Sequence, residues 1–273
     1  MGKDGVVVVV GGLKGGTGRT TIATNMAVKF RQLGYRTALV GIDPQEVLLK
    51  WRKVRASEGR LLVAETGRTM CHLEVYSYWE SDALQSSTPD FDVQSLNDAP
   101  LRFDIEALKC LIPKFDVIII DVGARSEEEL FSVSQIADLI VSPLMLSAFD
   151  VETLPRFKKL LDQAMSCNPH LRVGFLLNEI ADDATREFIY KIRGDIDKVI
   201  GGYERYFQFV QELGCREAFR ETVPYGLAVN EMPVVDRDTV REFSSLFDAV
   251  TKELKDKCRS DFVVNNAYAG YWA

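Results

Sequence analysis

The stretch "VVVVVGGLKGGTGRTT", Val6–Thr21, decides the fold. Five consecutive valines are typical of a strand that is buried on both faces of a sheet. The glycines that follow allow a tight turn whose N–H groups can point inward at an anion. Apolar residues at helical spacing then predict a helix over 20–33, and the N-terminus of a helix attracts phosphate. We interpret the stretch as a phosphate-binding loop between a strand and a helix; the alternative is an ordinary glycine-rich turn.

Further apolar runs alternate with helical patterns along the chain. Four of these runs predict strands, over 37–42, 117–120, 138–144 and 172–178. The spacing of Val151, Leu154, Leu161 and Met165 predicts a helix between the last two. Alternation of this kind predicts an α/β fold, with a single doubly wound, mostly parallel sheet covered by helices on both faces.

Length and composition fit one α/β domain, with two also possible. The chain has 273 residues, of which 47% are hydrophobic, so residues 1–273 can form a single large core. An acidic, serine-rich and aromatic stretch at about 66–103 breaks the alternation and is expected to be an insert. A polar and aromatic tail at about 260–273 is expected to lie outside the core.

Net charge and cysteine spacing indicate which kinds of partner and cell compartment to expect. The net charge is −7, which argues against nucleic-acid binding through bulk charge and leaves a local basic patch open. The five cysteines are far apart and form no C-x-x-C pair, which is typical of reduced thiols in a cytosolic protein. Neither a signal peptide nor a membrane-spanning run is recognisable, so a cytoplasmic location is expected.

Polar residues at the strand ends suit a metal–nucleotide site. The Thr20 hydroxyl, directly after the loop, is placed to hold Mg²⁺. Asp43 and Asp121 end two buried strands, and two carboxylates beside a phosphate loop suit Mg²⁺ coordination and water positioning. Asn178, at the end of a later strand, is either a turn residue or a ligand of the base.

The loop and the next strand resemble the ParA/MinD family. "KGGTGRTT" is similar to the deviant phosphate loop K-G-G-x-G-K-[ST]-[ST], whose first lysine reaches the ATP of the partner in a dimer. Lys14 matches that lysine, and Arg19 stands where the family has its second lysine. "ALVGIDPQ" resembles D-x-D-P-Q, where Asp43 matches the aspartate at the hydrolytic water and Gly41 replaces the other aspartate.

Later segments continue this resemblance over residues 5–65 and 105–258. "FDVIIIDVGARS" is similar to the second acidic motif, which implies a place for Asp121 in the Mg²⁺ shell, and "FLLNEI" implies that Asn178 reads adenine. "ADLIVSPLMLSAFDVETL" and "REAFRETVPYGLAVNEM" resemble segments of small plasmid-type ParA proteins. The implied catalytic residues are Lys14, Asp43 and Arg19, the metal ligands Thr20, Asp43 and Asp121, and the nucleotide-binding residues Gly15, Gly16, Thr17, Gly18, Arg19, Thr20, Thr21 and Asn178.

The resemblance implies an ATP- and Mg²⁺-dependent switch that forms a homodimer around ATP, hydrolyses ATP slowly and positions DNA cargo such as a plasmid. The implied partners are non-specific DNA and a small DNA-binding adaptor protein, with no membrane. Arginine is broader than lysine, so Arg19 is expected to lower hydrolysis more than binding. Two alternatives stay open: a catalytically weak nucleotide-dependent scaffold that positions a protein complex, and a ligase-like enzyme of the same superfamily.

Two predicted helices carry the candidate DNA-binding cations. One is expected over 182–198 and the other at the C-terminal end of the chain. The second carries a similar number of acidic residues, so a solvated face is as good an interpretation. The cations are Arg186, Lys191, Arg193 and Lys198 on the first helix, and Arg237, Arg241, Lys252, Lys255, Lys257 and Arg259 on the second, with Arg205, Arg216 and Arg220 between them.

Overall fold

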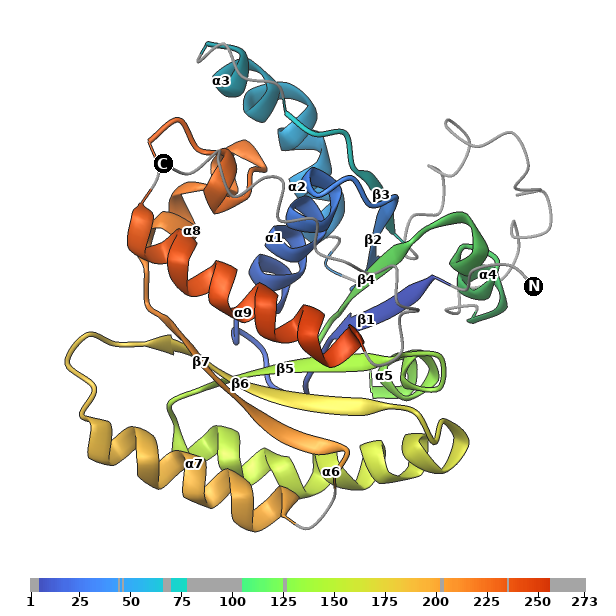
Figure 1. Cartoon of the computed structure of the whole chain (residues 1–273), viewed down its shortest axis with the longest axis vertical. Coiled ribbons are helices and arrows are strands. Elements are labelled where there is room, and N and C mark those ends of the chain that lie inside the picture. The colour runs from blue at the N-terminus through green and yellow to red at the C-terminus, as the bar shows by residue number, and fades with distance from the viewer. Residues whose placement is uncertain are drawn as a thin grey trace.

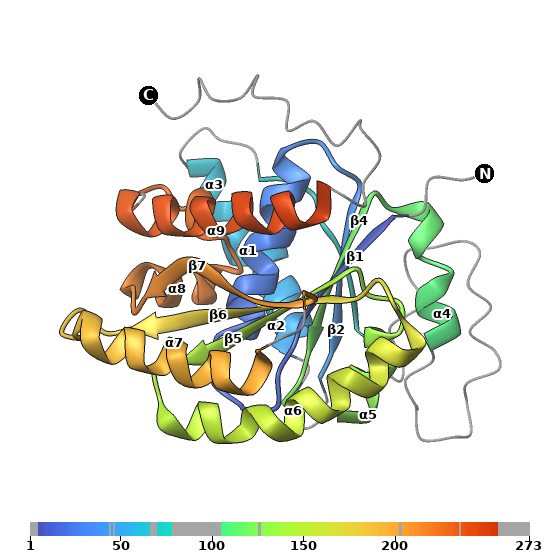
Figure 2. The same cartoon turned by 60° about the horizontal axis from the view of Figure 1, so that its bottom comes forward.

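A computed structural model describes residues 5–43, 45, 47–65, 70–77, 105–124, 127–201, 204–234 and 236–255. Seven strands form one sheet in the order β3-β2-β4-β1-β5-β6-β7, and every pairing between neighbouring strands is parallel. The sheet crosses the molecule diagonally, and helices lie on both of its faces (Figures 1 and 2). The predicted doubly wound α/β class is confirmed.

The strands lie close to their expected positions, with two additions. The five expected strands are present, and two of them are longer than predicted because pairing continues past their apolar runs. The additions lie at the two edges of the sheet. The bounds are β1 Val6–Val10, β2 Thr37–Ile42, β3 Glu74–Ser77, β4 Val117–Val122, β5 Leu139–Met145, β6 Arg172–Ile180 and β7 Tyr206–Gly214.

The helices divide between the two faces. Buried side chains of α1, α2 and α9 pack on one face, and those of α4, α5, α6 and α7 pack on the other. Figure 2 shows α9 and α1 above the sheet, with α6 and α5 below it. The bounds are α1 Arg19–Gln32, α2 Val47–Val54, α3 Arg60–Glu65, α4 Ile105–Lys109, α5 Glu127–Ser134, α6 Ala148–Cys167, α7 Arg186–Ile200, α8 Glu217–Glu221 and α9 Arg237–Lys255. Short turns of other helical types are η1 Arg55–Gly59, η3 Ile112–Lys114, η4 Val223–Tyr225 and η5 Val229–Glu231.

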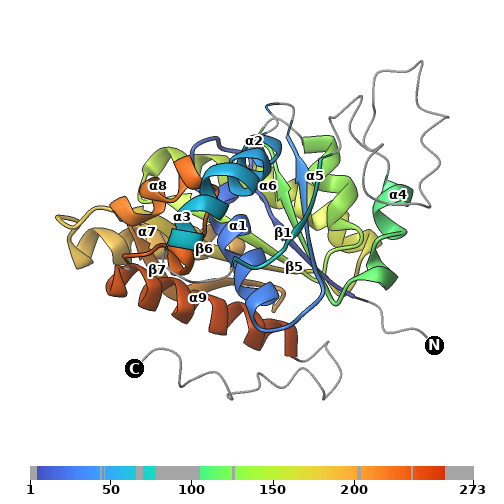
Figure 3. The same ribbon diagram turned by 90° about the horizontal axis from the view of Figure 1, so that it is seen from above.

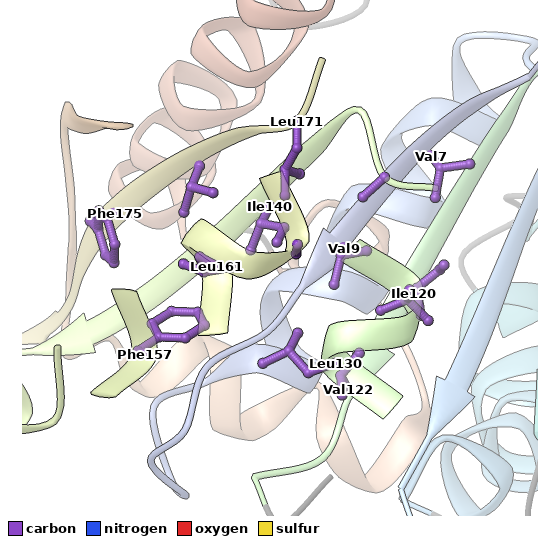
Figure 4. Packing of buried hydrophobic residues seen from close by; sticks show 14 of the residues in the cluster. Val7, Val9, Ile120, Val122, Leu130, Ile140, Phe157, Leu161, Leu171 and Phe175 are labelled. Carbon is purple, nitrogen blue, oxygen red and sulfur yellow. The ribbon is translucent and has the colours of Figure 1, made fainter. Parts of the chain in front are cut away.

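The valine run of β1 serves both halves of the core. Val7 and Val9 point to the face that α5 and α6 cover, where Leu130, Phe157 and Leu161 meet them in one cluster (Figure 4). Val6, Val8 and Val10 point to the opposite face and pack in the cluster of α1 and α9. Successive side chains of a strand alternate between faces, so an unbroken apolar run is what a central strand requires.

The central position of β1 places the loop after it at a switch point of the sheet. From β1 the chain moves to one side through β2 and β3, returns to β4, and then builds β5, β6 and β7 on the other side. In a parallel sheet all carboxyl ends lie at one edge, and ligands bind at the switch point there. Residues that follow β1, β2, β4, β5 and β6 therefore converge at this edge.

The structure refines two expected boundaries. Part of the insert expected at 66–103 belongs to the sheet, because residues 74–77 form β3 and pair with β2. The helix expected over 182–198 begins at Arg186, because the Thr185 hydroxyl accepts a hydrogen bond from the N–H of Phe188 (3.2 Å) and caps it there. The tail expected at 260–273, with Lys257 and Arg259 just before it, lies outside the described residues.

Candidate nucleotide-binding site

The loop between β1 and α1 has the backbone that a phosphate cradle needs. Gly16 and Gly18 take positive φ angles of 75° and 82°. Only glycine adopts this region at little cost, so both positions require it. A Cβ at Gly18 would also collide with the side-chain amide of Asn178. The loop ends at the N-terminus of α1, which directs unpaired N–H groups and a partial positive charge at the same space.

Asn178, which the resemblance implies reads the base, lies against the phosphate loop. Its Nδ2 donates a hydrogen bond to the carbonyl oxygen of Thr17 (2.8 Å), and the side chain is buried. This bond ties the end of β6 to the phosphate loop across 161 residues of sequence. With one N–H engaged, Asn178 can offer its side-chain carbonyl oxygen and its second N–H to a ligand.

Arg19 closes the loop on itself. Its Nη1 donates to the carbonyl oxygen of Gly12 (2.5 Å), and the residue is 9% exposed. Burial lowers the pKa of the guanidinium, while the charges of Asp121 and Asp43 act in the opposite direction. The side chain stays charged in a protein, so it supplies a fixed positive charge inside the loop. The expectation that Arg19 faces bound phosphate in its own subunit is compatible with this position.

Thr20 and Asp121 meet beside the loop. The Thr20 hydroxyl donates to Oδ2 of Asp121 (2.6 Å). Burial raises the pKa of Asp121 to about 6, the hydrogen bond from Thr20 and the charge of Arg19 oppose this, and the charge of Asp43 adds to it. A carboxylate that is costly to ionise alone is one that a cation would stabilise. The donor set of hydroxyl and carboxylate oxygens fits Mg²⁺.

Asp43 lies on the other side of this site, directly after β2. Its Oδ1 accepts a hydrogen bond from the N–H of Gln45 (3.0 Å), and it faces Gly123, where a Cβ would lie 3.1 Å from the same oxygen. Gly41, where the resembled motif has an aspartate, packs instead against Leu48, whose Cβ would lie 3.2 Å from a Cβ at that position. An apolar side chain therefore occupies the space beside Gly41.

Lys14 has a partner that the sequence did not reveal. Its Nζ forms an ion pair with Oδ2 of Asp150, which lies at the start of α6. The Lys14 side chain is 32% exposed, whereas that of Asp150 is 1% exposed. Asp150 also accepts from the N–H of Met145 (3.3 Å), so its position is fixed by the strand before it. Asp150 is part of "SAFDVETL", but no role could be assigned to it from sequence.

A pocket opens beside the loop. It extends from the phosphate loop to the ends of β6 and β7 and to α8. Glu179 in its wall has a positive φ of 54°, a conformation uncommon for a residue with a side chain. The lining residues are Gly18, Thr21, Ile22, Asn178, Glu179, Leu213, Gly214, Cys215, Arg216, Phe219, Arg220 and Val223. The pocket thus borders the phosphate loop at Gly18 and the first turn of α1 at Thr21.

Many of the candidate DNA-binding cations are paired with carboxylates. Arg186 and Arg193 both contact Glu212, at 2.8 and 3.0 Å. Lys198 contacts Asp195 (2.6 Å). Other pairs are Arg216 with Glu242 and Asp182, and Arg241 with Asp238. The positive charge of these side chains is thus partly neutralised within the described part of the chain.

The described residues carry neither a clustered metal site nor a membrane span. No group of three or more His, Cys, Asp or Glu side chains among them is arranged to hold a metal ion. A Mg²⁺ ion at Thr20 and Asp121 would therefore need further ligands from phosphate or water. Within the same residues, no helix is both long and apolar enough to cross a membrane.

Comparisons with known proteins match nearly the whole chain to a nucleotide-binding domain family. The CobQ/CobB/MinD/ParA nucleotide binding domain matches residues 8–270. The chain is 23% identical over 243 residues to the chromosome partitioning protein ParA of Myxococcus xanthus, covering 84% of this chain and 78% of that protein. It is 25% identical over 173 residues to the maintenance of carboxysome distribution protein A of Halothiobacillus neapolitanus, covering 63% and 65%.

Solved structures share the fold. A plasmid partition protein of Borrelia burgdorferi bound to AMPPNP superposes with a TM-score of 0.61 at 14% identity, over 91% of this chain and 99% of that chain. A Cyanothece McdA variant in complex with ATP gives a TM-score of 0.59 at 16% identity, over 93% and 97%. Together with the domain match over residues 8–270, these findings identify the chain as a member of the CobQ/CobB/MinD/ParA nucleotide-binding domain family.

Proposed function

We propose that the chain is an ATP-dependent dimerisation switch that positions an intracellular cargo. The observation that carries the proposal is the different placement of the two cations of the loop. Arg19 is buried and bonded to Gly12 of its own loop, whereas Lys14 is a third exposed and pairs with a residue outside the loop. Arg19 is suited to neutralise phosphate in its own subunit. Lys14 is suited to leave its partner in its own chain and contact the phosphate of another subunit.

Electrostatics explains why such a lysine would matter. Two ATP molecules face to face bring about eight negative charges into one interface, and like charges repel by several kcal/mol at an effective dielectric of about 20. One lysine crossing from each subunit would offset this repulsion. ADP lacks the γ-phosphate that Lys14 would contact, so it would leave the monomer favoured. A ligand shifts such an equilibrium only through contacts that differ between the two states.

In the monomer, Lys14 would then pair with Asp150 and not with the ATP of a partner subunit. Because Asp150 is buried, its carboxylate is costly to leave without a cation. ATP bound to a partner has to compete with this carboxylate, which keeps the nucleotide-free monomer from dimerising. The switch on this proposal is an exchange of one lysine between a carboxylate in its own chain and a phosphate in the other.

Hydrolysis would use the residues at the carboxyl ends of β2 and β4. Mg²⁺, when bound, neutralises phosphate charge and orients it for attack. Thr20 and Asp121 would hold the ion, and Asp43 would orient the attacking water. The bond from Arg19 to the Gly12 carbonyl has to rearrange for the guanidinium to follow charge on the transferred group. We therefore expect slow turnover.

The cargo is proposed from the relatives. Their names describe chromosome partitioning and the distribution of carboxysomes. Plasmid or other DNA segregation, through non-specific DNA and a small DNA-binding adaptor, is the first candidate. A scaffold that positions a protein complex is the second, and the pairing of Arg186 and Arg193 with Glu212 favours it, because paired cations offer less charge to DNA.

Two experiments test the proposal. Light scattering with ADP, ATP and a non-hydrolysable analogue should show a dimer with the two triphosphates only, and a monomer for Lys14→Ala with every nucleotide. Dimerisation of Lys14→Ala at the wild-type ATP concentration would contradict the lysine exchange. Gel shifts at low salt then separate the cargoes: ATP-dependent, salt-sensitive binding supports DNA, and no shift supports the scaffold.

A further inference from the structure

Arg55 and Glu231 form a buried ion pair away from the nucleotide site. Nη1 of Arg55 donates to Oε2 of Glu231 (2.6 Å), and Nη2 donates to Oε1 (2.7 Å), so the pair is bidentate. The two side chains are 6% and 4% exposed. The guanidinium also lies over the ring of Trp51, 5.1 Å from its centroid. Arginine in such a fork geometry fixes orientation as well as distance.

The pair joins two segments that are far apart in sequence. Arg55 is the first residue of η1, which connects α2 to α3 in the helical arm Val47–Glu65. Glu231 lies in η5, at the end of the segment 222–231 that begins beside the pocket. Figures 1 and 3 show α2 and α3 next to α8 and the turns that follow it, although the two regions are far apart in sequence. The described chain also places η1 and α2 in contact with η4.

Segment 222–231 is clamped closely. Nη1 of Arg55 also donates to the carbonyl oxygen of Gly226 (3.0 Å), and Gly226 has a φ of 61°. A Cβ at Gly226 would lie 2.6 Å from the carbonyl oxygen of Trp51, and a Cβ at Gly59 would collide with the carbonyl oxygen of Tyr225. Two glycines therefore let the backbones of the arm and the segment touch, and a shift of one must move the other.

The same segment is tied to the helix of the phosphate loop. Oδ1 of Asn25 accepts from the N–H of Val229 (2.9 Å), and Nδ2 of Asn25 donates to the carbonyl oxygen of Thr21 (2.8 Å). Thr21 and Val223 both line the pocket beside the loop. The position of Val223 in the pocket wall thus depends on the bonds that hold the rest of segment 222–231. Among these bonds the Arg55–Glu231 pair is the strongest, because both groups are charged and two N–H groups donate.

We infer that Arg55 and Glu231 are positioning residues for a purine base: the pair holds segment 222–231, and with it Val223, in place in one wall of the pocket beside the phosphate loop. The inference rests on the proposed nucleotide binding and deepens it by assigning base discrimination to residues that touch no nucleotide. Discrimination between bases depends on contacts held in fixed geometry, and it falls when a wall moves. The triphosphate, held by the loop, is expected to be affected little.

The test compares the affinities for Mg-ATP and Mg-GTP in matched variants. The double variant Arg55→Met/Glu231→Leu removes both charges, so neither is left buried alone, and such replacements are often tolerated. We expect its preference for ATP over GTP to fall about tenfold, mostly through weaker ATP binding, with GTP affinity changed less than about twofold. Arg55→Lys, which keeps the charge but not the fork, should lose about threefold of the preference. It also serves if the double variant fails to fold.

The control is a second arginine–glutamate pair. Arg172 at the start of β6 contacts Glu253 of α9, at the opposite end of the strand that carries Asn178. Arg172→Met/Glu253→Leu should leave the ratio of the two affinities unchanged. An unchanged ratio in the Arg55 variants, or equal losses for ATP and GTP, would overturn the inference, as would a wild type that binds both equally. A wild type that binds neither nucleotide would overturn the proposed function instead.

Discussion

Lys14 and Asp150, separated by 136 residues in sequence, form an ion pair within one chain. The pair connects the loop after the central strand β1 to the N-terminus of α6, after the neighbouring strand β5. The two residues meet because parallel strands bring their carboxyl ends to one edge. Lys14 is thus held above the phosphate loop by a carboxylate that is nearly inaccessible to solvent.

Asp150→Asn is expected to ease dimerisation. The amide keeps the shape and can still accept from the N–H of Met145, but it no longer attracts Lys14. Because Lys14 is partly exposed, the effect is modest, and the ATP concentration at half-dimerisation should fall about fivefold. Light scattering across an ATP titration measures this. Asp162→Asn, which removes the partner of Lys158 on the same helix, is the control and should leave the midpoint unchanged.

Arg19→Lys is expected to raise the rate of ATP hydrolysis by about tenfold, since one well-placed donor contributes about 10²–10³ in rate and Arg19 already supplies part of it. A compact ammonium can leave the Gly12 carbonyl and follow phosphate more readily than the planar fork. Phosphate release at saturating Mg-ATP checks this, with affinity changed less than about threefold. Arg31→Lys, in the last turn of α1, is the control. A slower Arg19→Lys protein would show that arginine is the better cation here.

Asp121→Asn should stabilise the metal-free protein above pH 6. The folded-state pKa of about 6 lies above the ordinary value of 3.8, so the protonated form is favoured in the folded protein. The wild type therefore loses stability as the pH rises from about 4 to about 6, by about 3 kcal/mol from this group, and the loss stays complete above that range. Denaturant unfolding of both proteins at pH 4 and pH 8 measures it. A stability difference that does not change with pH would contradict the burial of an ionisable carboxyl.

The variants Gly18→Ala and Gly34→Ala distinguish the cost of a positive φ angle from the cost of a steric clash with Asn178. Both glycines have positive φ angles, 82° and 91°, but a Cβ at Gly34 meets nothing within 4 Å, whereas one at Gly18 collides with Asn178. Gly34→Ala should cost about 1 kcal/mol of unfolding free energy through φ alone. Gly18→Ala should cost more and abolish detectable ATP binding. Equal costs, with binding retained in both, would show that the Asn178 contact does not fix the loop.

Cys71 is expected to be the slowest to react of the four described cysteines. Burial and the nearby carboxylate of Glu231 raise the pKa of its thiol to about 12, so almost none of it is thiolate at pH 8. Cys110, Cys167 and Cys215 are exposed. Alkylation at pH 8 followed by peptide mass spectrometry should label these three at least about a hundredfold faster than Cys71. Comparable rates would show that segment 222–231 opens away from η1.

The sequence was informative where one residue type dictates one environment. A run of valines has few alternatives to a buried central strand. Glycine at positions 16 and 18 indicates a tight turn, and both residues indeed take positive φ angles. The edge strand β7 was missed because only Tyr206, Phe209 and Leu213 are buried in it and polar residues lie between them, unlike the continuous apolar run of an interior strand. β3 was missed because it has only four residues inside a polar stretch.

Contacts between side chains that are far apart in sequence could be predicted only in part. Thr20, Asp43, Asp121 and Asn178 could be predicted to converge because each lies near or just after the carboxyl end of a strand in one parallel sheet. The pairing of Lys14 with Asp150, and of Arg55 with Glu231, depends on how helices and turns pack above that edge. Side-chain spacing along the chain carries no information about such contacts, so they required three-dimensional structure.

The central place of β1 has a consequence for how the chain folds. β1 is synthesised before its two neighbours, β4 and β5, whose residues 117 and 139 pair with Val6 and Val8. More than 100 residues must therefore be made before the most apolar strand acquires either neighbour. Long-range parallel pairing slows folding and leaves such a strand open to aggregation in the meantime. On the ribosome, the segment that later forms the nucleotide loop therefore emerges well before the strands that enclose it.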